Sequence, residues 1–439
     1  MLKVVTGNLK EIELLDAMCG TGKSHNLFKF IASKPTEQYL YVTPMLSEVS
    51  TRPAEELAKF DECGVVFEEP TGEGFRTKGD HLLALLAEGK NAICTHALYL
   101  GLGLAGQTSI ARFGYTTVID EELGMIEPLN DAQLAKEDRK VLVQEKVITT
   151  DADGKVVWNN EAWGSGESAF AEVRKMAEDG SLYSTQDGTF FNVQLPIELV
   201  TASKRVIVAT YMFEGSVFEA FLKIKGITHK PFEFDGLQLR NEAELKTAIR
   251  ERVELLDCSG TSDKLLRSLK VPVDDLAAKR KNSVFSATWY RNATKDQVKL
   301  VGNYVRNVAR QMDAKPENLL YTLPSTVAGK RGDRWVKSGK VLKVKGFSPE
   351  NCFLHKGARA TNDYVHKTSA IHVYNRYPHP AVVRYLEEQG GRVDQDNFAL
   401  AEMIQWFFRT AIRVPNGPKV KLHIASPRMA SLFQNWLER

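Results

Sequence analysis

The feature that most constrains this chain is a short apolar segment followed at once by a glycine-rich turn. Residues 12–16 read Ile-Glu-Leu-Leu-Asp, and residues 17–24 read Ala-Met-Cys-Gly-Thr-Gly-Lys-Ser. A strand that leads into a Gly-x-Gly-Lys-Ser turn and then a helix is typical of a phosphate-binding loop. Gly20 and Gly22 allow the tight turn, so backbone N–H groups can point at phosphate oxygens. The sequence therefore predicts a strand–turn–helix unit that binds the phosphates of a nucleotide.

The side chains of this loop have separate expected roles. Lys23 can reach the β- and γ-phosphates, the hydroxyl of Ser24 can bind Mg²⁺, and Thr21 lies within the cradle. A helix expected over residues 25–33 adds the partial positive charge of its N-terminus. A glycine-rich turn with a chance lysine is the alternative, and a second motif downstream argues against it.

The second motif is the segment Val118-Ile119-Asp120-Glu121-Glu122. Asp120 is expected to hold Mg²⁺, and Glu121 to polarise the attacking water. Acidic residues at strand ends are common, so the segment is a weak signal by itself. It follows the loop by about a hundred residues, which suits a strand next to the loop in a parallel sheet. Together the two motifs predict hydrolysis of a nucleoside triphosphate.

Composition excludes several classes of protein. The chain has 439 residues, of which 43% are hydrophobic and 26% charged, as in ordinary globular proteins with a large core. It has no long apolar run, so neither a membrane span nor an export signal is expected. The five cysteines are scattered without a C-x-x-C pair. This pattern argues against a zinc site or disulfide framework and predicts a cytoplasmic protein.

Charge divides the chain into two halves. Residues 1–250 carry 26 Lys and Arg against 37 Asp and Glu, a net charge of −11. Residues 251–439 carry 32 against 18, a net charge of +14. A basic C-terminal half is expected to face a polyanion such as nucleic acid. A basic surface that is simply solvated explains the charge equally well.

Short apolar segments alternate with helical patterns in the first half, which indicates a parallel α/β sheet. Two hairpin signatures, at 146–158 and 182–193, indicate an insertion at about 130–200. We therefore expect a first domain over residues 1–240 and a second α/β domain over 245–439. The expected strands of the first domain are 12–15, 38–42, 65–67, 91–94, 116–119 and 205–209.

In the second domain, Gln405 and Arg409 are expected to share one face of a helix over 400–410, with Arg413 at or past its end. Arginines that a second domain turns toward a triphosphate would stabilise phosphoryl transfer. Aromatic residues 406–408 in the core, with solvated arginines, are the alternative. A basic run at 330–337 suits a nucleic-acid backbone or forms a solvated loop. The other expected elements are helix 295–312, strand 318–322, strand 370–374, strand 421–425 and helix 428–437.

Compared motif by motif, the chain resembles superfamily 2 helicases, the two-domain RecA-like nucleic-acid translocases. Residues 17–24 look like their motif I, Asp120-Glu121 like motif II, and Val208-Ala209-Thr210 like motif III. The compact form looks most like helicases that tailed bacteriophages encode. The remaining matches are residues 41–44 and 94–96 for motifs Ia and Ib, 320–322 for motif IV, 356–363 for motif V and 405–413 for motif VI.

This resemblance implies two tandem RecA-like domains with ATP and Mg²⁺ in a cleft between them, completed by Gln405 and by Arg409 or Arg413. Thr210 is implied to couple hydrolysis to movement. The implied activity is translocation along, or unwinding of, single- or double-stranded nucleic acid. DNA is favoured, and the protein is expected to be a monomer in the host cytoplasm that works with phage replication or recombination proteins. The residues implied to grip a strand through its phosphates are Thr43, Pro44, Thr95, Thr322, Arg359 and Thr361.

The chain departs from the family pattern in three places. The two arginines follow Gln405 at +4 and +8, whereas in the family the second arginine lies closer to the glutamine. Either Arg409 or Arg413 is therefore the arginine finger. Motif II reads Asp-Glu-Glu-Leu, and no glutamine precedes the loop, which leaves selectivity for ATP open. A remodelling or annealing ATPase, a non-translocating NTP switch and a packaging motor remain alternatives. A packaging motor would carry a nuclease with clustered carboxylates, whereas the second half is poor in acidic residues.

Overall fold

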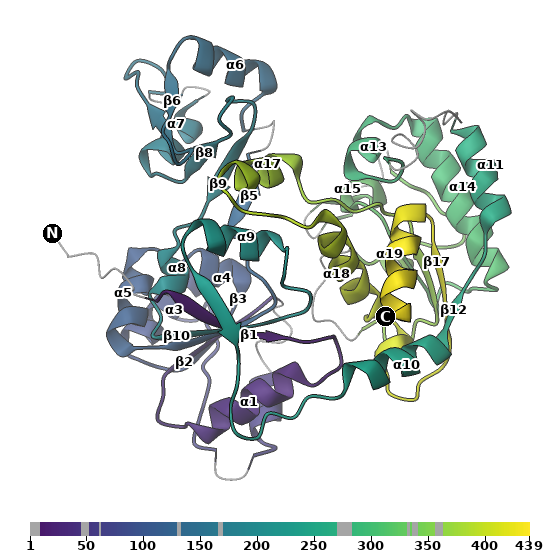
Figure 1. The fold of residues 1–439 in the computed structure, drawn as a ribbon, viewed down its shortest axis with the longest axis horizontal. Coiled ribbons are helices and arrows are strands. Elements are labelled where there is room, and N and C mark those ends of the chain that lie inside the picture. The colour runs from purple at the N-terminus through teal and green to yellow at the C-terminus, as the bar shows by residue number, and fades with distance from the viewer. Residues whose placement is uncertain are drawn as a thin grey trace. The chain divides into compact units, whose positions relative to one another are not determined.

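The chain forms two compact units (Figure 1). Unit 1 holds residues 1–18, 22–239 and 378–395, and unit 2 holds residues 19–21, 240–377 and 396–439. Segment 378–395 of unit 1 belongs to the C-terminal half, which the sequence assigned as a whole to the second domain. The computed structural model describes residues 9–44, 52–60, 63–129, 133–165, 170–269, 283–331, 334–335, 341–355 and 363–439.

The centre of unit 1 is a parallel sheet of six strands in the order β11-β1-β10-β4-β2-β3. Along β2, Leu40 and Val42 join one hydrophobic cluster and Tyr39 and Tyr41 another, because successive side chains of a strand point to opposite faces. Both faces are therefore covered, as in other parallel sheets. The strands are β1 (Glu11–Asp16), β2 (Tyr39–Thr43), β3 (Ala92–Thr95), β4 (Thr116–Asp120), β10 (Arg205–Thr210) and β11 (Thr228–Pro231).

Five of the six strands expected in this sheet are present, and one prediction is wrong. Residues 65–67 do not form a strand: Glu68 makes a single bridge to Ala92, and Val66 is 72% exposed. Strand β11 was missed because all four of its residues are exposed at the sheet edge. An edge strand of polar residues carries no apolar pattern from which it could be predicted.

Helices of unit 1 alternate with its strands along the sequence, because parallel neighbours need crossover connections. Helix α1 begins directly after the glycine-rich turn and buries Leu27, Phe28 and Ile31. Ser216 caps α9 through the N–H of Glu219. The helices are α1 (Lys23–Ser33), α2 (Arg52–Leu57), α3 (Lys78–Ala87), α4 (His96–Leu100), α5 (Leu104–Phe113), α8 (Glu198–Thr201) and α9 (Val217–Ile224).

Residues 126–194, which we call the insertion, lie between β4 and β10 and have their own small core. They contain an antiparallel sheet in the order β5-β9-β8 and a hairpin of β6 and β7. Both predicted hairpins are thus confirmed. The elements are β5 (Ile126–Pro128), α6 (Lys136–Gln144), β6 (Ile148–Thr150), β7 (Val156–Trp158), α7 (Ala171–Glu178), β8 (Leu182–Ser184) and β9 (Phe191–Gln194).

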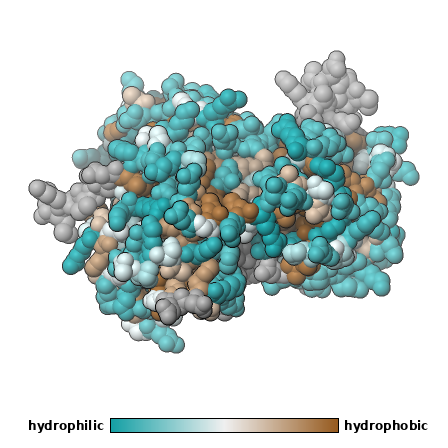
Figure 2. Space-filling model, turned by 60° about the horizontal axis from the view of Figure 1, so that its bottom comes forward, coloured by the Kyte–Doolittle hydropathy of each residue, from teal (hydrophilic) through white to brown (hydrophobic). Residues whose placement is uncertain are grey.

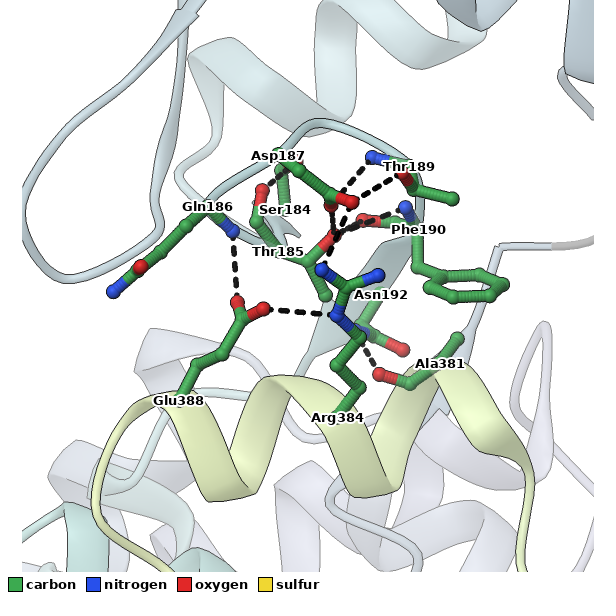
Figure 3. Close-up of polar contacts among 10 residues, drawn as sticks. All are labelled: Ser184, Thr185, Gln186, Asp187, Thr189, Phe190, Asn192, Ala381, Arg384 and Glu388. Atoms are coloured by element: carbon green, nitrogen blue, oxygen red, sulfur yellow. Dashed lines mark hydrogen bonds and ion pairs between the residues drawn. The ribbon is translucent and has the colours of Figure 1, made fainter.

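A helix from the C-terminal half, α17 (Pro380–Glu388), packs against the insertion and α9. Figure 3 shows Arg384 reaching toward the turn between β8 and β9, where its Nη2 lies 2.9 Å from Asp187 Oδ2. Glu388 accepts the N–H of Gln186 at 2.8 Å, and buried Asn192 donates to the carbonyl of Ala381 at 3.1 Å. The chain therefore enters unit 1 at residue 378 and returns to unit 2 at residue 396.

The carboxylate at the centre of this contact ionises readily. Burial opposes ionisation of Asp187, but hydrogen bonds from Thr189 and Thr185, together with the Arg384 guanidinium, lower its pKa to about 2. Both partners are exposed by more than a third, so solvent weakens the attraction between them. Docking of α17 rests mainly on its buried face, where Tyr385 and Leu386 join the core of unit 1.

Unit 2 contains a parallel sheet of four strands in the order β12-β17-β16-β13. Its longest helix, α14 (Lys295–Gln311), starts at a capping box made by Thr294 and Gln297. The strands are β12 (Val253–Leu255), β13 (Leu319–Thr322), β16 (Ser369–His372) and β17 (Val420–Ile424), and a short pair is formed by β14 (Lys330–Arg331) and β15 (Arg334–Trp335). The other helices are α10 (Glu242–Arg252), α11 (Ser259–Ser268), α13 (Ala287–Asn292), α15 (Ser325–Ala328), α16 (Pro349–Cys352), α18 (Gln395–Phe407), the 3-10 turn η2 (Ala411–Arg413) and α19 (Pro427–Glu438).

The predicted fold class, α/β with parallel sheets, is confirmed in both units. One helix was placed wrongly by the sequence. The helix expected over 400–410 spans Gln395–Phe407 instead. Its last turn is closed by Thr410, whose hydroxyl donates to the carbonyl of Phe407, so the regular helix stops before Arg409.

The packing of α14 allows a stability test. A Cβ on Gly302 would lie 2.4 Å from the backbone oxygen of Lys343, and backbone cannot swing aside. Gly302→Ala should therefore destabilise the protein by about 1–3 kcal/mol, although alanine normally favours a helix. Gly260→Ala in α11, where nothing lies within 4 Å, is the matched control and should stabilise by up to about 1 kcal/mol. Urea unfolding measures both, and equal stability of the two variants would contradict this packing.

The face drawn in Figure 2 is mainly hydrophilic. Among the described residues, the large apolar side chains that are most exposed, such as Val66, Leu104 and Val157, come from separate elements. Single exposed apolar residues are normal on protein surfaces. No helix in the described ranges combines the length and apolarity that a bilayer span requires.

Candidate nucleotide-binding site

The glycine-rich loop joins β1 to α1, as predicted. Gly20 and Gly22 have φ values of +87° and +96°, a left-handed conformation that residues with a Cβ rarely adopt. Asn26 fixes the end of the loop, because its side chain donates to the carbonyls of Gly22 and Gln238 at 3.0 and 2.9 Å. The turn is therefore held open for backbone N–H groups to face a ligand.

Lys23 is the first residue of α1 and is only 9% exposed. Its Nζ donates to the carbonyl of Ala17, at the start of the same loop. A bound triphosphate would offer charged oxygens in place of this neutral carbonyl, and charge-assisted hydrogen bonds are the stronger kind. The ammonium therefore lies at the loop, and exchanging the neutral carbonyl for a charged phosphate oxygen would strengthen its hydrogen bond.

Three neighbouring strands end at one edge of the sheet and bring the predicted residues together. Asp16 of β1 pairs in register with Thr210 of β10, and Ala209 of β10 pairs with Asp120 of β4. Asp120 does not lie on the strand next to β1, as the sequence suggested, because β10 lies between them. The loop and the acidic motif are therefore separated by one strand, with Thr210 in the middle.

Thr210 connects the two motifs. Its carbonyl accepts the N–H of Ala17 at 3.0 Å, and its hydroxyl lies 3.5 Å from Glu122 Oε1. Thr210 is 1% exposed, so its position follows the strand. Glu121 adopts a φ of +69° and donates its N–H to the carbonyl of Ala209 at 2.8 Å. Such a φ is uncommon for a non-glycine residue and typical of functional sites.

Several residues of this edge were missed by the sequence. Asp16 accepts the N–H groups of Met212 and Phe213, at 2.8 and 3.0 Å, and thereby fixes the turn after β10. Tyr41 donates to Asp120 Oδ2 at 3.3 Å, and His96 Nε2 lies 2.9 Å from the backbone oxygen of Asp120. A charged residue at the end of an apolar strand was the available signal for Asp16. Tyr41 and His96 fall within the segments that resemble motifs Ia and Ib, but nothing in the sequence placed them beside Asp120, because only the sheet order brings them there.

The donor set suits a Mg²⁺–triphosphate ligand. Ser24 offers a hydroxyl and Asp120 a carboxylate, which are oxygen ligands of the kind Mg²⁺ prefers. Among the described residues, no three His, Cys, Asp or Glu side chains are close enough to hold a metal by themselves. Mg²⁺ normally completes its shell with waters and substrate phosphates, so two protein ligands beside the glycine-rich loop are consistent with this ion.

Only some of the residues implied to bind nucleic acid lie together at one edge of a sheet. Thr43 and Thr95 pair in register at the same edge of the sheet, and Pro44 follows Thr43. Thr95 caps α4 by accepting the N–H of Leu98 at 3.3 Å, and Thr43 is fully buried. In unit 2, Thr322 is also fully buried, and its hydroxyl has no partner among the described residues. Arg359 and Thr361 lie outside the described residues.

The motif VI residues lie in unit 2 and are not on one helical face. Gln405 is in the last turns of α18 and partly exposed, whereas Arg409 lies beyond its end and is 6% exposed. Arg413 ends η2 and is partly exposed. The predicted i, i+4 relation of Gln405 and Arg409 is therefore wrong, because the chain leaves the helix between them. The alternative is confirmed for residues 406–408, whose three aromatic rings are buried, but its solvated arginines are wrong for Arg409, which is buried as well.

A buried histidine beside this segment predicts acid sensitivity. Burial lowers the pKa of His372 to about 3, its ring lies 5.4 Å from that of Trp406, and its Nδ1 has no hydrogen-bond partner among the described residues. In the unfolded chain this histidine takes up a proton near pH 6.5, whereas in the folded protein it stays neutral down to about pH 3. Its contribution to the free energy of unfolding is therefore complete above pH 6.5 and is lost as the pH falls toward 3. From pH 6.5 to 5 the loss should be about 2 kcal/mol.

Urea unfolding at pH 7 and pH 5 measures this effect. His372→Asn, which cannot take up the proton, should reduce the drop in unfolding free energy, while the partly exposed His81→Asn serves as the control. Burial also lowers the pKa of His423, so some of the drop should persist in His372→Asn. An unchanged pH dependence in His372→Asn would contradict the prediction.

Comparison with known proteins points to one group of relatives. A family described as the YonV C-terminal Rossmann-like domain matches residues 263–437, and the YonV middle domain matches residues 129–192. The SPbeta prophage-derived uncharacterized protein YonV of Bacillus subtilis (strain 168) is 27% identical over 446 residues, covering 98% of this chain and 99% of YonV. The matched segments include most of the insertion and the helix α17 that docks on it.

Solved structures give weaker similarities. Xpd4 of S. tokodaii has 14% identity and a TM-score of 0.43, with 97% of this chain and 94% of Xpd4 covered. S. cerevisiae Dbp5 bound to RNA and ADP BeF3 has 10% identity and a TM-score of 0.35, with 97% and 83% covered. The helicase MrfA bound to DNA and AMPPNP has 11% identity and a TM-score of 0.32, and the chain spans about half of it. TM-scores at this level do not establish a shared activity.

Proposed function

We propose that this protein hydrolyses ATP with Mg²⁺ and uses the energy to move along, or unwind, nucleic acid. The observation that carries the proposal is the alignment of three motifs on adjacent strand ends of unit 1. The phosphate loop follows β1, Thr210 ends β10, and Asp120-Glu121 ends β4. A phosphate cradle, a metal carboxylate and a water-polarising carboxylate are the parts that NTP hydrolysis requires.

Each residue of the site has a proposed role. The loop N–H groups of residues 20–22 and the Lys23 ammonium bind the triphosphate, while Ser24 and Asp120 hold Mg²⁺. When bound, the ion would neutralise charge on the β- and γ-phosphates. Glu121 orients the attacking water and takes its proton. Thr210 is hydrogen-bonded to both the loop and Glu122 and transmits the conformational change that follows hydrolysis.

Unit 2 would contribute cations that complete the site in the working complex. We propose Arg413 as the arginine finger, since Arg409 is buried, with Gln405 beside it at the reacting phosphate. An arginine supplied only on closure makes hydrolysis depend on the conformation of the whole protein. Such a dependence is what couples turnover to movement on a track.

The track is proposed to be DNA, held through its phosphates. The net charge of +14 in residues 251–439 supports a polyanionic partner. We propose a role in phage DNA replication, recombination or repair in the host cytoplasm, and the prophage origin of the YonV relative supports the phage setting. We propose that Thr43, Pro44, Thr95, Thr322, Arg359 and Thr361 line the path. A remodelling or annealing ATPase is the second candidate, because the same site would serve it.

ATP turnover measured with single-stranded DNA, duplex DNA and RNA, at low and physiological salt, tests the proposal. Turnover should rise severalfold with the preferred polynucleotide, and the rise should shrink as salt increases. Glu121→Gln serves as the background control, because loss of the general base should lower ATP turnover about a hundredfold or more. Turnover that no polynucleotide changes would exclude a translocase and leave an NTP switch. Strand separation measured on a forked duplex then distinguishes unwinding from annealing.

A further inference from the structure

One arginine of unit 2 holds the turn that carries Arg413. Arg252 is the last residue of α10, and its guanidinium donates to four backbone carbonyls. Nη1 lies 3.2 Å from the oxygen of Ile412 and 2.8 Å from that of Val414. Nη2 lies 2.7 Å from the oxygen of Ala411 and 3.2 Å from that of Pro418.

These carbonyls surround Arg413 on both sides. The chain leaves α18 at residue 407, forms the short η2 turn and then runs through a loop to β17 at residue 420. Two carbonyls of this segment accept backbone N–H groups of the loop itself, because Val414 donates to Ala411 at 3.2 Å and Gly417 donates to Val414 at 3.1 Å. In addition, the carbonyls of residues 411, 412, 414 and 418 share the single guanidinium of Arg252, which thereby ties the two ends of the loop together.

The loop is also shaped to receive this side chain. Asn416 adopts a φ of +54°, and Gly417 donates its N–H to the carbonyl of Val414 at 3.1 Å. A Cβ on Gly417 would lie 2.9 Å from Arg252 Nη2. The close approach of the backbone to the guanidinium therefore depends on a residue without a side chain at position 417.

We propose that Arg252 is a positioning residue for the arginine finger: it fixes residues 411–418 so that Arg413 is presented in one orientation. This inference rests on the proposed function, in which Arg413 stabilises the transferring phosphate. Displacement of a catalytic group by about 1 Å can cost about a hundredfold in rate. Arg252 touches neither nucleotide nor nucleic acid in this assignment and acts only through the backbone beside Arg413.

Lysine cannot replace Arg252 in this role. A guanidinium is planar and offers five donors in a fixed fork, whereas an ammonium is a compact charge with three. Arg252→Lys keeps the charge but cannot span four carbonyls. Arg250→Lys is a matched control, because Arg250 lies on the same helix and donates to the backbone oxygen of Leu437 through Nε and Nη2, at 3.1 and 2.6 Å. It anchors α19 instead of the loop.

The full-length variants are compared in polynucleotide-stimulated ATP turnover, in affinity for a fluorescent ATP analogue and in hydrogen exchange of residues 411–418. Arg252→Lys should lower kcat at least about tenfold, leave nucleotide affinity within twofold and speed exchange in the loop. Arg250→Lys should leave kcat within about twofold and exchange in the loop unchanged. Added guanidinium ion should restore part of the turnover of Arg252→Ala, because it can occupy the vacated site.

The outcomes separate this inference from the proposed function. If the wild-type protein does not turn over ATP, the proposed function fails, and the positioning role fails with it. If the wild type is active and Arg252→Lys keeps its kcat despite faster exchange, Arg252 is a structural anchor only. Unchanged exchange in the loop, or an equal loss of kcat in both variants, also overturns the positioning role.

Discussion

Lys23→Ala is expected to abolish ATP turnover, with a loss of at least about 10³-fold. Lys23 is the cation that can reach the β- and γ-phosphates from the loop, and it is held at the first position of α1 with its ammonium against the carbonyl of Ala17. Removing a charged donor from a preorganised site leaves the developing phosphate charge uncompensated. Release of inorganic phosphate at saturating ATP and polynucleotide measures the effect.

The matched control is Lys29→Ala, on the same helix. Lys29 donates to the carbonyl of Gly236 at 2.8 Å and is not part of the loop, so turnover should stay within about twofold of wild type. Thermal unfolding of both variants checks that the fold is intact. Turnover by Lys23→Ala above a tenth of the wild-type rate would show that the loop is not the site of hydrolysis.

Arg413→Ala is expected to lose about 10³–10⁵-fold in turnover while still binding nucleotide. An arginine finger acts on charge that develops in the transition state, so its removal affects kcat more than affinity. Arg413 is partly exposed at the end of η2, and its flanking carbonyls are held by Arg252. Arg409→Ala should instead lower stability, because Arg409 is 6% exposed within unit 2.

Steady-state kinetics and nucleotide titration of Arg413→Ala and Arg409→Ala decide between the two arginines. Arg267→Ala, an exposed arginine on α11, controls for the loss of one positive charge. A larger loss of kcat in Arg409→Ala than in Arg413→Ala, with normal unfolding, would assign the finger to Arg409. Normal rates in both would remove unit 2 from the chemistry.

Local pattern predicted the elements whose residues are buried in a regular order. The loop at 17–24, the strands at 116–119 and 205–209 and both insertion hairpins follow from glycine positions, turn residues and apolar runs. The end of α18 could not be predicted in the same way. Apolar residues 406–408 continue the helical pattern, and only the hydroxyl of Thr410 and the packing of the three rings show where the helix stops.

The order of segments along the chain also predicted the wrong domain for a segment that crosses between the units. Residues 378–395 follow β16 in sequence, and nothing in their composition separates them from the second domain. Their docking depends on the core of unit 1, which Tyr385 and Leu386 join, and on contacts with Asp187 and Asn192 nearly two hundred residues earlier. Contacts at such separation leave no trace in a local pattern, since they are set by complementary surfaces and not by neighbouring residues.

The glycine-rich loop, the acidic motif and the α/β class can be read from the chain alone, because each depends on residues that are adjacent in sequence. Long-range packing places β10 between β1 and β4, brings Asp16, Tyr41 and His96 to the same edge of the sheet, and sets Arg252 against the turn around Arg413. Sheet order and long-range hydrogen bonds arise from how whole elements pack, because packing must bury the apolar faces and still give buried polar groups their hydrogen-bond partners.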